Sequence, residues 1–232
     1  MKLNLGCGHE YMEGWVNVDA PKDELCYDDL KADLHARIED LAYPDGAIEE
    51  INLKAVFEHF PRHVAIMQLR KFYKWLSHDG GKLTILVPDF WGTVEMMRKS
   101  GSPQERQFWY RHLFGPQDTI QYGTHYDSFD LEKLDQIFSI VGFAKGEHTI
   151  IKRWPSIIYT GIKTGPVKTD SDAERDIIAY LANYETRDEA GIAFAAWMRS
   201  IGLEAKKPQT PVFATHEMRG TESVFDRFKR RR

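Results

Sequence analysis

The chain has 232 residues, 42% of them apolar and 28% charged, and its formal net charge is −4. These values are ordinary for a globular domain and exclude a fibrous or low-complexity chain. A mildly acidic total argues against a general nucleic-acid coat. The two cysteines, Cys7 and Cys26, are too few for a disulfide framework, so we expect a reducing, cytoplasmic environment. No stretch approaches the ~18 apolar residues of a membrane span, and the start lacks the apolar core of a signal peptide.

Short β-rich runs alternate with helical patterns along the first two thirds of the chain. Strands are expected at residues 3–5, 15–19, 47–53 and 82–87, where apolar and β-branched residues gather. Apolar residues at helical spacing between Ile66 and Leu76 predict a helix that Gly80 and Gly81 would end. Strands that alternate with helices are typical of a parallel α/β sheet.

Further along, Asp130 is expected to cap a helix that Gly142 ends. Residues 147–152 and 156–162 are two β-rich runs around Trp154-Pro155, which predicts an antiparallel hairpin at the sheet edge. After Gly165 the pattern becomes helical. Two amphipathic faces are expected there, one made of Ile177, Ile178, Leu181 and Tyr184 and the other of Phe194, Trp197, Met198 and Ile201.

The first predicted strand ends in Gly6-Cys7-Gly8, a loop in which the backbone can approach a ligand closely, because glycine has no Cβ and tolerates positive φ. Asp19 ends the next strand, where a carboxylate can accept hydrogen bonds from a ribose. Tyr11 stands where a dinucleotide fingerprint needs a third glycine, and the span up to Val16 is too short for a crossover helix. The loop therefore favours a nucleoside ligand without a pyrophosphate, and it disfavours a nicotinamide oxidoreductase.

Residues 2–8 and 14–19 resemble the first two motifs of class I S-adenosylmethionine-dependent methyltransferases. The likeness is greatest to a bacterial subgroup associated with the synthesis of cell-surface polysaccharides. Further blocks of the resemblance are residues 32–34, 41–46, 56–60, 75–83, 87–89, 125–130 and 142–143. The resemblance implies a Rossmann-like, seven-stranded, mostly parallel sheet with an antiparallel last strand over residues 1–163. Residues 164–232 would be a helical extension with a basic C-terminal tail.

The same resemblance implies S-adenosylmethionine as the cofactor. The residues expected at the cofactor are Asn4, Gly6, Cys7, Gly8, Asp19, Asp33, Leu34 and Lys54. The glycine loop would line the methionine and ribose, Asp19 would hold the ribose hydroxyls, and Asp33 and Leu34 would flank the adenine. Lys54 stands where the family often has a small polar residue. Cys7 is interpreted as a small wall residue and not as a nucleophile, because no base can be named for it.

Methyl transfer is an in-line displacement, so the protein must mainly align the reactants, and a hydroxyl acceptor must also lose a proton. His59, His125 and Asp89 are the candidate catalytic residues, with Glu58 beside them, because all follow predicted strands. Either histidine could instead be structural, and Asp89 could cap a helix. The carboxylates Glu58, Asp89 and Asp127 form no recognisable metal motif, so no metal is assigned.

Aromatic residues gather between Phe90 and Tyr126 and suit the flat face of a sugar, although they could also form a small satellite core. Trp91, Tyr122 and Tyr126 are the candidate acceptor-binding residues. No Asn-Pro-Pro-Tyr or Asp-Pro-Pro-Tyr element is present, which argues against methylation of DNA adenine.

We therefore expect an S-adenosylmethionine-dependent methyltransferase that O-methylates a sugar hydroxyl on a glycan or nucleotide-sugar intermediate. The alternative is a non-catalytic cofactor-binding module that acts as the partner subunit of a glycan-synthesis enzyme. RNA methylation stays open. The C-terminal helices could pack on the core, form a homodimer or dock a glycosyltransferase. The basic run from Lys229 to Arg232 is expected to be a solubilising end, with weak contact to anionic lipid as the alternative.

Overall fold

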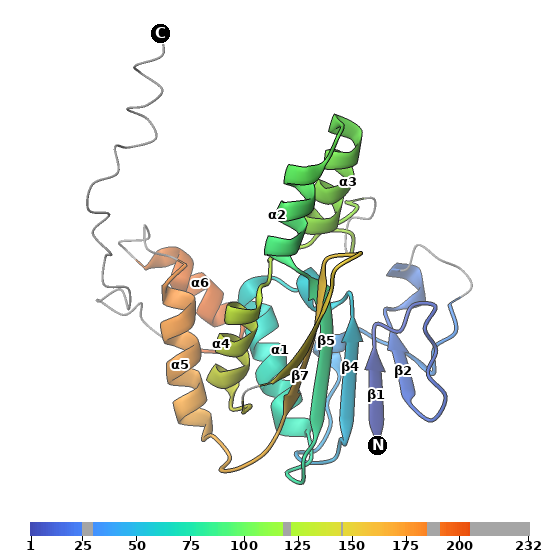
Figure 1. The fold of residues 1–232 in the computed structure, drawn as a ribbon. Coiled ribbons are helices and arrows are strands. Elements are labelled where there is room, and N and C mark those ends of the chain that lie inside the picture. Colours follow the sequence, from blue (N-terminus) through green and yellow to red (C-terminus); the bar gives the residue numbers. More distant parts are fainter. Residues whose placement is uncertain (25–29, 118–121, 145, 185–190, 205–232) are drawn as a thin grey trace.

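The computed structural model describes residues 1–24, 30–117, 122–144, 146–184 and 191–204. Seven strands form one sheet in the order β3-β2-β1-β4-β5-β7-β6 (Figure 1). They are β1 (Lys2–Leu5), β2 (Val16–Asp19), β3 (Leu34–His35), β4 (Glu50–Lys54), β5 (Lys82–Pro88), β6 (Glu147–Ile151) and β7 (Ser156–Ile162). Only β7 runs antiparallel to its neighbours β5 and β6 within this sheet, while the other pairs are parallel. This is the Rossmann-like fold of class I methyltransferases, as the resemblance predicts.

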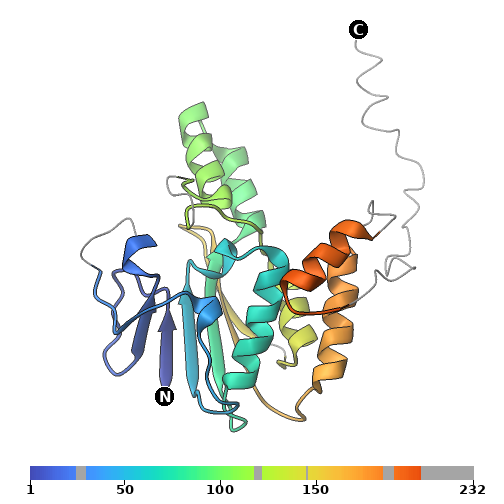
Figure 2. The ribbon, with the colours of Figure 1, turned by 180° about the vertical axis from the view of Figure 1, so that it is seen from behind.

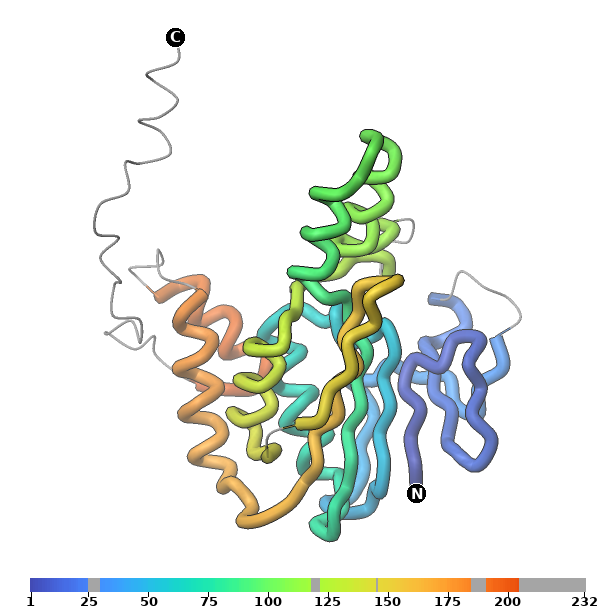
Figure 3. The backbone as a smooth tube through the Cα atoms, viewed as in Figure 1, coloured from blue at the N-terminus to red at the C-terminus, as the bar shows by residue number. Residues whose placement is uncertain are grey.

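The described residues also form six helices and three short 3-10 turns. The helices are α1 (Arg62–Trp75), α2 (Phe90–Lys99), α3 (Pro103–Phe114), α4 (Leu131–Val141), α5 (Asp170–Ala182) and α6 (Ile192–Ser200), and the turns are η1 (Lys22–Glu24), η2 (Ile38–Asp40) and η3 (Phe57–His59). Helices α1, α4, α5 and α6 gather on one side of the sheet (Figure 2). Helices α2 and α3 form a hairpin that projects beyond the end of β5 (Figure 3). None of the described helices combines the length and apolar character needed to cross a bilayer.

The ends of two helices were predicted from sequence, with different outcomes. Asp130 caps α4 as expected, because its side chain accepts a hydrogen bond from the backbone N–H of Lys133 at 2.8 Å, and Gly142 ends the helix in a left-handed conformation. Helix α1 ends earlier than predicted, at Trp75. Leu76 is already extended and forms a β-bridge with Ile48. This pairing ends the helix before the chain reaches Gly80.

The two faces of the sheet differ in character. Leu83, Ile85 and Val87 of β5 point to the side of the helices and are fully buried in the core. The opposite face carries a polar row at one register level, made of Asn17, Asn4, Asn52, Thr84 and Thr160 on five neighbouring strands. Among the described elements, no helix lies in front of β1, β4 and β5 on this side (Figure 1).

The connection from β1 to β2 is a loop of residues 6–15 without a helix. Parallel neighbours usually need a longer, helical crossover, so this loop must satisfy its backbone polar groups in another way. Side-chain amides supply the partners. Asn4 donates to the carbonyl of Glu10 at 2.8 Å, and Asn17 donates to Met12 and Trp15 while accepting from the N–H of Met12 at 2.8 Å. Asn52 donates to the side-chain oxygen of Asn4 at 2.8 Å and joins β4 to the same network.

The helices after Gly165 pack on the core. Phe194 and Met198 of α6 belong to the buried cluster, and so do Ile177 and Leu181 of α5. Arg70 of α1 fastens this extension, since it donates to the carbonyl of Val141 and forms an ion pair with Asp170 at the start of α5. Residues 205–232, which include the basic run from Lys229 to Arg232, lie outside the described residues.

Replacing Asn17 with Ala removes the central amide of the loop network. The carbonyls of Met12 and Trp15 and the N–H of Met12 lose their partner, which we expect to lower the free energy of unfolding by about 2–4 kcal/mol. Urea denaturation measures this change. Gln104→Ala, which removes an amide from an exposed position of α3, is the matched control and should stay within about 0.5 kcal/mol. Equal stability of the two variants would contradict this role of Asn17.

Candidate functional site

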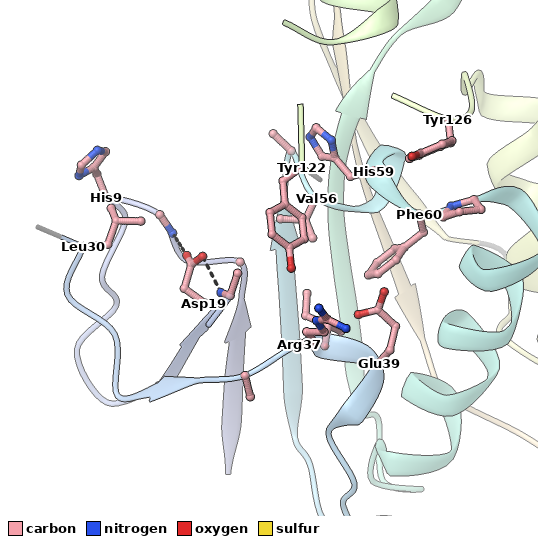
Figure 4. A pocket seen from close by; sticks show the side chains of 17 residues that line it. His9, Asp19, Leu30, Arg37, Glu39, Val56, His59, Phe60, Tyr122 and Tyr126 are labelled. Carbon is pink, nitrogen blue, oxygen red and sulfur yellow. Dashed lines mark hydrogen bonds between the residues drawn. The ribbon is translucent and has the colours of Figure 1, made fainter. Parts of the chain in front are cut away.

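A cavity of about 400 Å³ opens at the carboxyl ends of β1, β2 and β4 (Figure 4). Open α/β sheets bind ligands at this edge, and the volume lies in the range of small-molecule pockets. The lining residues come from the loops after four strands and from the segment after α3. They are Gly6, Gly8, His9, Asp19, Ala20, Leu30, Ala36, Arg37, Ile38, Glu39, Ala55, Val56, His59, Phe60, Pro61, Tyr122 and Tyr126.

Gly6 and Gly8 form a backbone cradle at one wall. Both have positive φ, +68° and +49°, which L side chains rarely adopt. A Cβ on Gly6 would lie 2.4 Å from a methyl carbon of Val56, so only glycine lets this loop lie against the start of the segment after β4. A Cβ on Gly8 would meet nothing within 4 Å, which leaves the backbone of Gly8 open to a ligand.

Asp19 lies beside this cradle with its carboxylate fixed by backbone groups (Figure 4). One oxygen accepts the N–H of Gly8 at 2.6 Å and the other accepts the N–H of Ala20 at 2.8 Å. Because a carboxylate oxygen has two acceptor sites, each oxygen keeps one for a ligand hydroxyl. The arrangement suits a diol such as that of a ribose.

Five other residues predicted at the cofactor are not in the cavity lining. Asn4 is buried in the amide network, and Cys7 lies behind the loop with its thiol near the carbonyl of Lys31. Asp33 accepts hydrogen bonds from the backbone and side chain of Asn17 and from the hydroxyl of Tyr11. Leu34 lies on the surface of edge strand β3, and Lys54 pairs with Glu10.

The wall opposite the cradle is made by residues 36–39 after β3, which the sequence analysis did not single out. The only feature in the sequence that could have indicated these residues is their position directly after β3, and β3 is only two residues long. Ala55 was also missed. It lines the cavity with a φ of +53°, an uncommon conformation for a residue with a side chain, and such positions cluster at functional sites.

Tyr122, which lines the cavity, is held by a hydrogen bond to the carboxylate of an ion pair. The three residues come from three separate segments of the chain. Arg37, after β3, donates to the carboxylate of Glu24 in η1, and the hydroxyl of Tyr122 donates to the same carboxylate. The hydrogen bonds from Arg37 and then from Tyr122 hold the pKa of Glu24 below its ordinary value, so the group is ionised. Tyr126 also lines the cavity, and half of it is exposed.

Two of the predicted catalytic residues, His59 and His125, lie together. Their ring centroids are 4.7 Å apart, with the planes nearly perpendicular, and His59 also lines the cavity. Burial lowers the pKa of both imidazoles, that of His125 to about 4, so both rings are neutral at neutral pH. Glu58 precedes His59 and is 1% exposed. Burial raises the pKa of its carboxyl to about 8.

Asp89 and Trp91 lie near the start of α2 and outside the cavity lining. Asp89 occupies the N-cap position, without a capping hydrogen bond from its side chain. Trp91 donates from its indole N–H to Asp130 at 3.1 Å and is largely exposed. Trp109 packs with Phe108 and with Trp154 of the β6–β7 turn, so part of the aromatic segment forms a satellite core.

Comparisons with known proteins reach the fold and no further. No family model matches the chain, and no curated protein matches it. A SAM-dependent methyltransferase from Methanosarcina mazei is similar over 71% of this chain and 92% of its own, with 9% identity and a TM-score of 0.43. The 1,6-didemethyltoxoflavin-N1-methyltransferase of Burkholderia thailandensis, solved with 1,6-didemethyltoxoflavin and S-adenosylhomocysteine, is similar over 71% of both chains, with 10% identity and a TM-score of 0.45.

A possible exported protein from Bordetella parapertussis is similar over 71% of this chain, with 11% identity and a TM-score of 0.46. The matching part of this chain spans 62% of that protein, which is less than two thirds. The fold class itself follows from the strand order and from the antiparallel β7, and these distant likenesses add nothing about activity.

Cys7 should resist alkylation in the native protein. Burial, followed by the charge of Asp19, raises the pKa of its thiol to about 12, so at pH 8 only about one molecule in ten thousand carries the reactive thiolate. In a Cys26→Ser background, iodoacetamide at pH 8 should leave the folded protein unmodified and label it fully in urea, as measured by mass spectrometry. Equal labelling rates in the two states would contradict the interpretation of Cys7 as a buried, inert thiol.

Proposed function

We propose that this chain is an S-adenosylmethionine-dependent methyltransferase that O-methylates a sugar hydroxyl on a glycan or nucleotide-sugar intermediate. The observation that carries the proposal is the cradle of Gly6 and Gly8 beside the fixed carboxylate of Asp19, opening onto a cavity at the carboxyl edge of a methyltransferase-type sheet. The motif resemblance at residues 2–8 and 14–19 supports the same cofactor.

The residues present fit this cofactor. The free acceptor sites of Asp19 match the two ribose hydroxyls, and the exposed backbone of Gly8 leaves room for the methionine part. The wall of residues 36–39 is then the natural place for the adenine, with the apolar side chain of Ile38 and the backbone near Ala36 at its face. Asp33 keeps a supporting role in this arrangement, because its carboxylate is already engaged by Asn17 and Tyr11.

The acceptor would enter beside His59. The aromatic rings of Tyr122 and Tyr126 line this part of the cavity and offer flat apolar faces to a sugar ring. Two observations therefore support a sugar as the acceptor: the flat aromatic faces of these side chains, and the resemblance of the motifs to a subgroup associated with polysaccharide synthesis.

S-adenosylmethionine supplies a methyl group bonded to a positively charged sulfur. The cradle of Gly6 and Gly8 and the carboxylate of Asp19 would hold the cofactor, so that an acceptor hydroxyl could lie in line with the methyl–sulfur bond. That bond would break as the oxygen–methyl bond forms, and S-adenosylhomocysteine would be the leaving group. The hydroxyl proton must leave as the new bond forms, and a neutral imidazole is a suitable base. His59 is the proposed base. Its Nδ1 lies 3.1 Å from the carbonyl of Thr124 and therefore carries the ring proton, which leaves Nε2 free to accept one.

Asp19→Ala should weaken the binding of S-adenosylmethionine and S-adenosylhomocysteine. The variant loses charge-assisted hydrogen bonds worth about 1.5–3 kcal/mol, which corresponds to about a 10- to 100-fold rise in Kd. Titration calorimetry measures both ligands. Asp79→Ala is the matched control, since Asp79 is an exposed carboxylate in the turn before β5, at the opposite edge of the sheet, and its affinity should equal that of the unaltered chain. Failure of the folded, unaltered chain to bind either ligand would overturn the proposal.

Methyl transfer itself should be detectable with labelled S-adenosylmethionine and a panel of nucleotide sugars and lipid-linked oligosaccharides. We expect one methyl group per acceptor molecule, and we expect His59→Ala to lower kcat by about 100-fold or more while the Kd for the cofactor stays unchanged. Cofactor binding without any labelled acceptor would favour the alternative, a non-catalytic partner subunit.

A further inference from the structure

A cluster of three potential metal ligands lies next to the cavity. Glu58 and His59 come from turn η3 after β4, and His125 comes from the segment that follows α3. One donor atom from each of the three side chains can be chosen so that all lie within 4.8 Å of one another. The two segments are also joined by their backbones, because the N–H of Tyr126 donates to the carbonyl of Glu58 at 2.9 Å.

Both imidazoles have one ring nitrogen next to a backbone carbonyl, as metal-binding histidines commonly do. Nδ1 of His59 lies 3.1 Å from the carbonyl of Thr124, and Nδ1 of His125 lies 3.2 Å from the carbonyl of Leu113. A carbonyl can only accept, so each Nδ1 carries the proton and each Nε2 keeps its lone pair. Histidines that bind metals commonly donate their other ring N–H to a backbone carbonyl in this way, which fixes the ring and its tautomer.

Glu58 provides an independent observation. Its side chain is 1% exposed, and its Oε2 atom has no hydrogen-bond partner among the described residues. Leaving a carboxyl oxygen buried and unpaired is costly, so a group that satisfies it is expected.

Three basic side chains, from α1, α4 and α3, have partners outside this cluster. Arg62 and Lys133 both pair with Asp127, at 2.9 and 2.6 Å, and the Nε2 of nearby His112 lies 2.8 Å from the carbonyl of Pro155. A cation held between Glu58 and the two histidines would supply the missing partner of Oε2.

We propose that Glu58, His59 and His125 bind one divalent transition-metal ion at the edge of the cavity. Two imidazole nitrogens and one carboxylate oxygen suit Zn²⁺, Mn²⁺, Co²⁺ or Fe²⁺, whereas Mg²⁺ and Ca²⁺ prefer oxygen ligands throughout. Three protein ligands leave coordination positions open. Because His59 also lines the cavity, an acceptor or water molecule in the cavity can take one of these positions.

The role of the ion in methyl transfer rests on the proposed function. A hydroxyl bound to a divalent ion has a lowered pKa and loses its proton to solvent more readily at neutral pH. With the ion bound, His59 and His125 are ligands, and the ion takes over the activation that the free imidazole would otherwise provide. The binding of the ion, in contrast, depends only on the three side chains.

The test uses the full chain after treatment with a chelator and its removal. Co²⁺ is titrated in while visible absorption is recorded, and Zn²⁺ and Mn²⁺ are titrated by calorimetry. We expect one ion per chain and Co²⁺ bands that Zn²⁺ displaces. Glu58→Gln and His125→Ala should each weaken binding on the order of 100-fold or more. His148→Ala removes an exposed imidazole from β6 and should leave the affinity unchanged.

Circular dichroism and thermal melting establish that each variant is folded. Glu58→Gln keeps the size of a side chain whose Oε2 has no hydrogen-bond partner in the described part of the chain, so we expect this variant to fold. It is then the decisive variant if His125→Ala does not fold. The proposal fails if the folded chain binds none of the three ions saturably, or if Glu58→Gln binds them as well as His148→Ala does. Cofactor affinity is measured separately, so loss of metal binding with cofactor binding intact refutes the metal site alone.

Discussion

The hydrogen bonds among Asn4, Asn17 and Asn52 hold the part of the structure on which the candidate site depends. These side chains lie on the neighbouring strands β1, β2 and β4, respectively. They supply hydrogen-bond partners for the backbone of the loop that joins the first two strands. The loop replaces a crossover helix, so its course is decided by side-chain amides and not by helical hydrogen bonds. Gly6 and Gly8 belong to the start of this loop, and Asp19, the last residue of β2, accepts the N–H of Gly8. The network that stabilises the loop therefore also supports the shape of the cavity.

The same constraint explains why the two faces of the sheet differ. Strands of a parallel sheet are normally buried on both faces, yet here one face bears a polar row that ends in a hydrogen bond between Thr84 and Thr160 at 2.9 Å. None of the described helices covers that face, and the apolar residues are concentrated on the other side, where α1, α4, α5 and α6 cover them. The extension after Gly165 thus completes the core of the sheet, and Arg70 ties it to α1.

The side of the cavity that holds the proposed catalytic residue His59 is built by segments far apart in the chain. His59 follows β4, His125 follows α3, and the backbone contact between Tyr126 and Glu58 brings the two segments together. Burial then gives these groups their chemistry, because it keeps both imidazoles neutral and leaves the carboxyl of Glu58 in need of a proton or a cation. The cluster of Glu58, His59 and His125 therefore combines polar side chains with little access to water, which favours both proton transfer and the binding of a cation.

The local pattern of the sequence was sufficient for the hairpin of β6 and β7, the cap of α4 and the glycine turn after β1, because these depend on neighbours within a few residues. The seven-stranded sheet with an antiparallel last strand was implied by the order of the motifs that resemble class I methyltransferases. It was insufficient for the end of α1, which a bridge between Leu76 and Ile48 decides. Only the tertiary structure showed that residues 36–39 line the cavity while Asp33 and Lys54 are engaged elsewhere. Only the tertiary structure brought Glu58, His59 and His125 together. The two histidines are 66 positions apart in the sequence, and a local pattern contains no information about contacts over that distance.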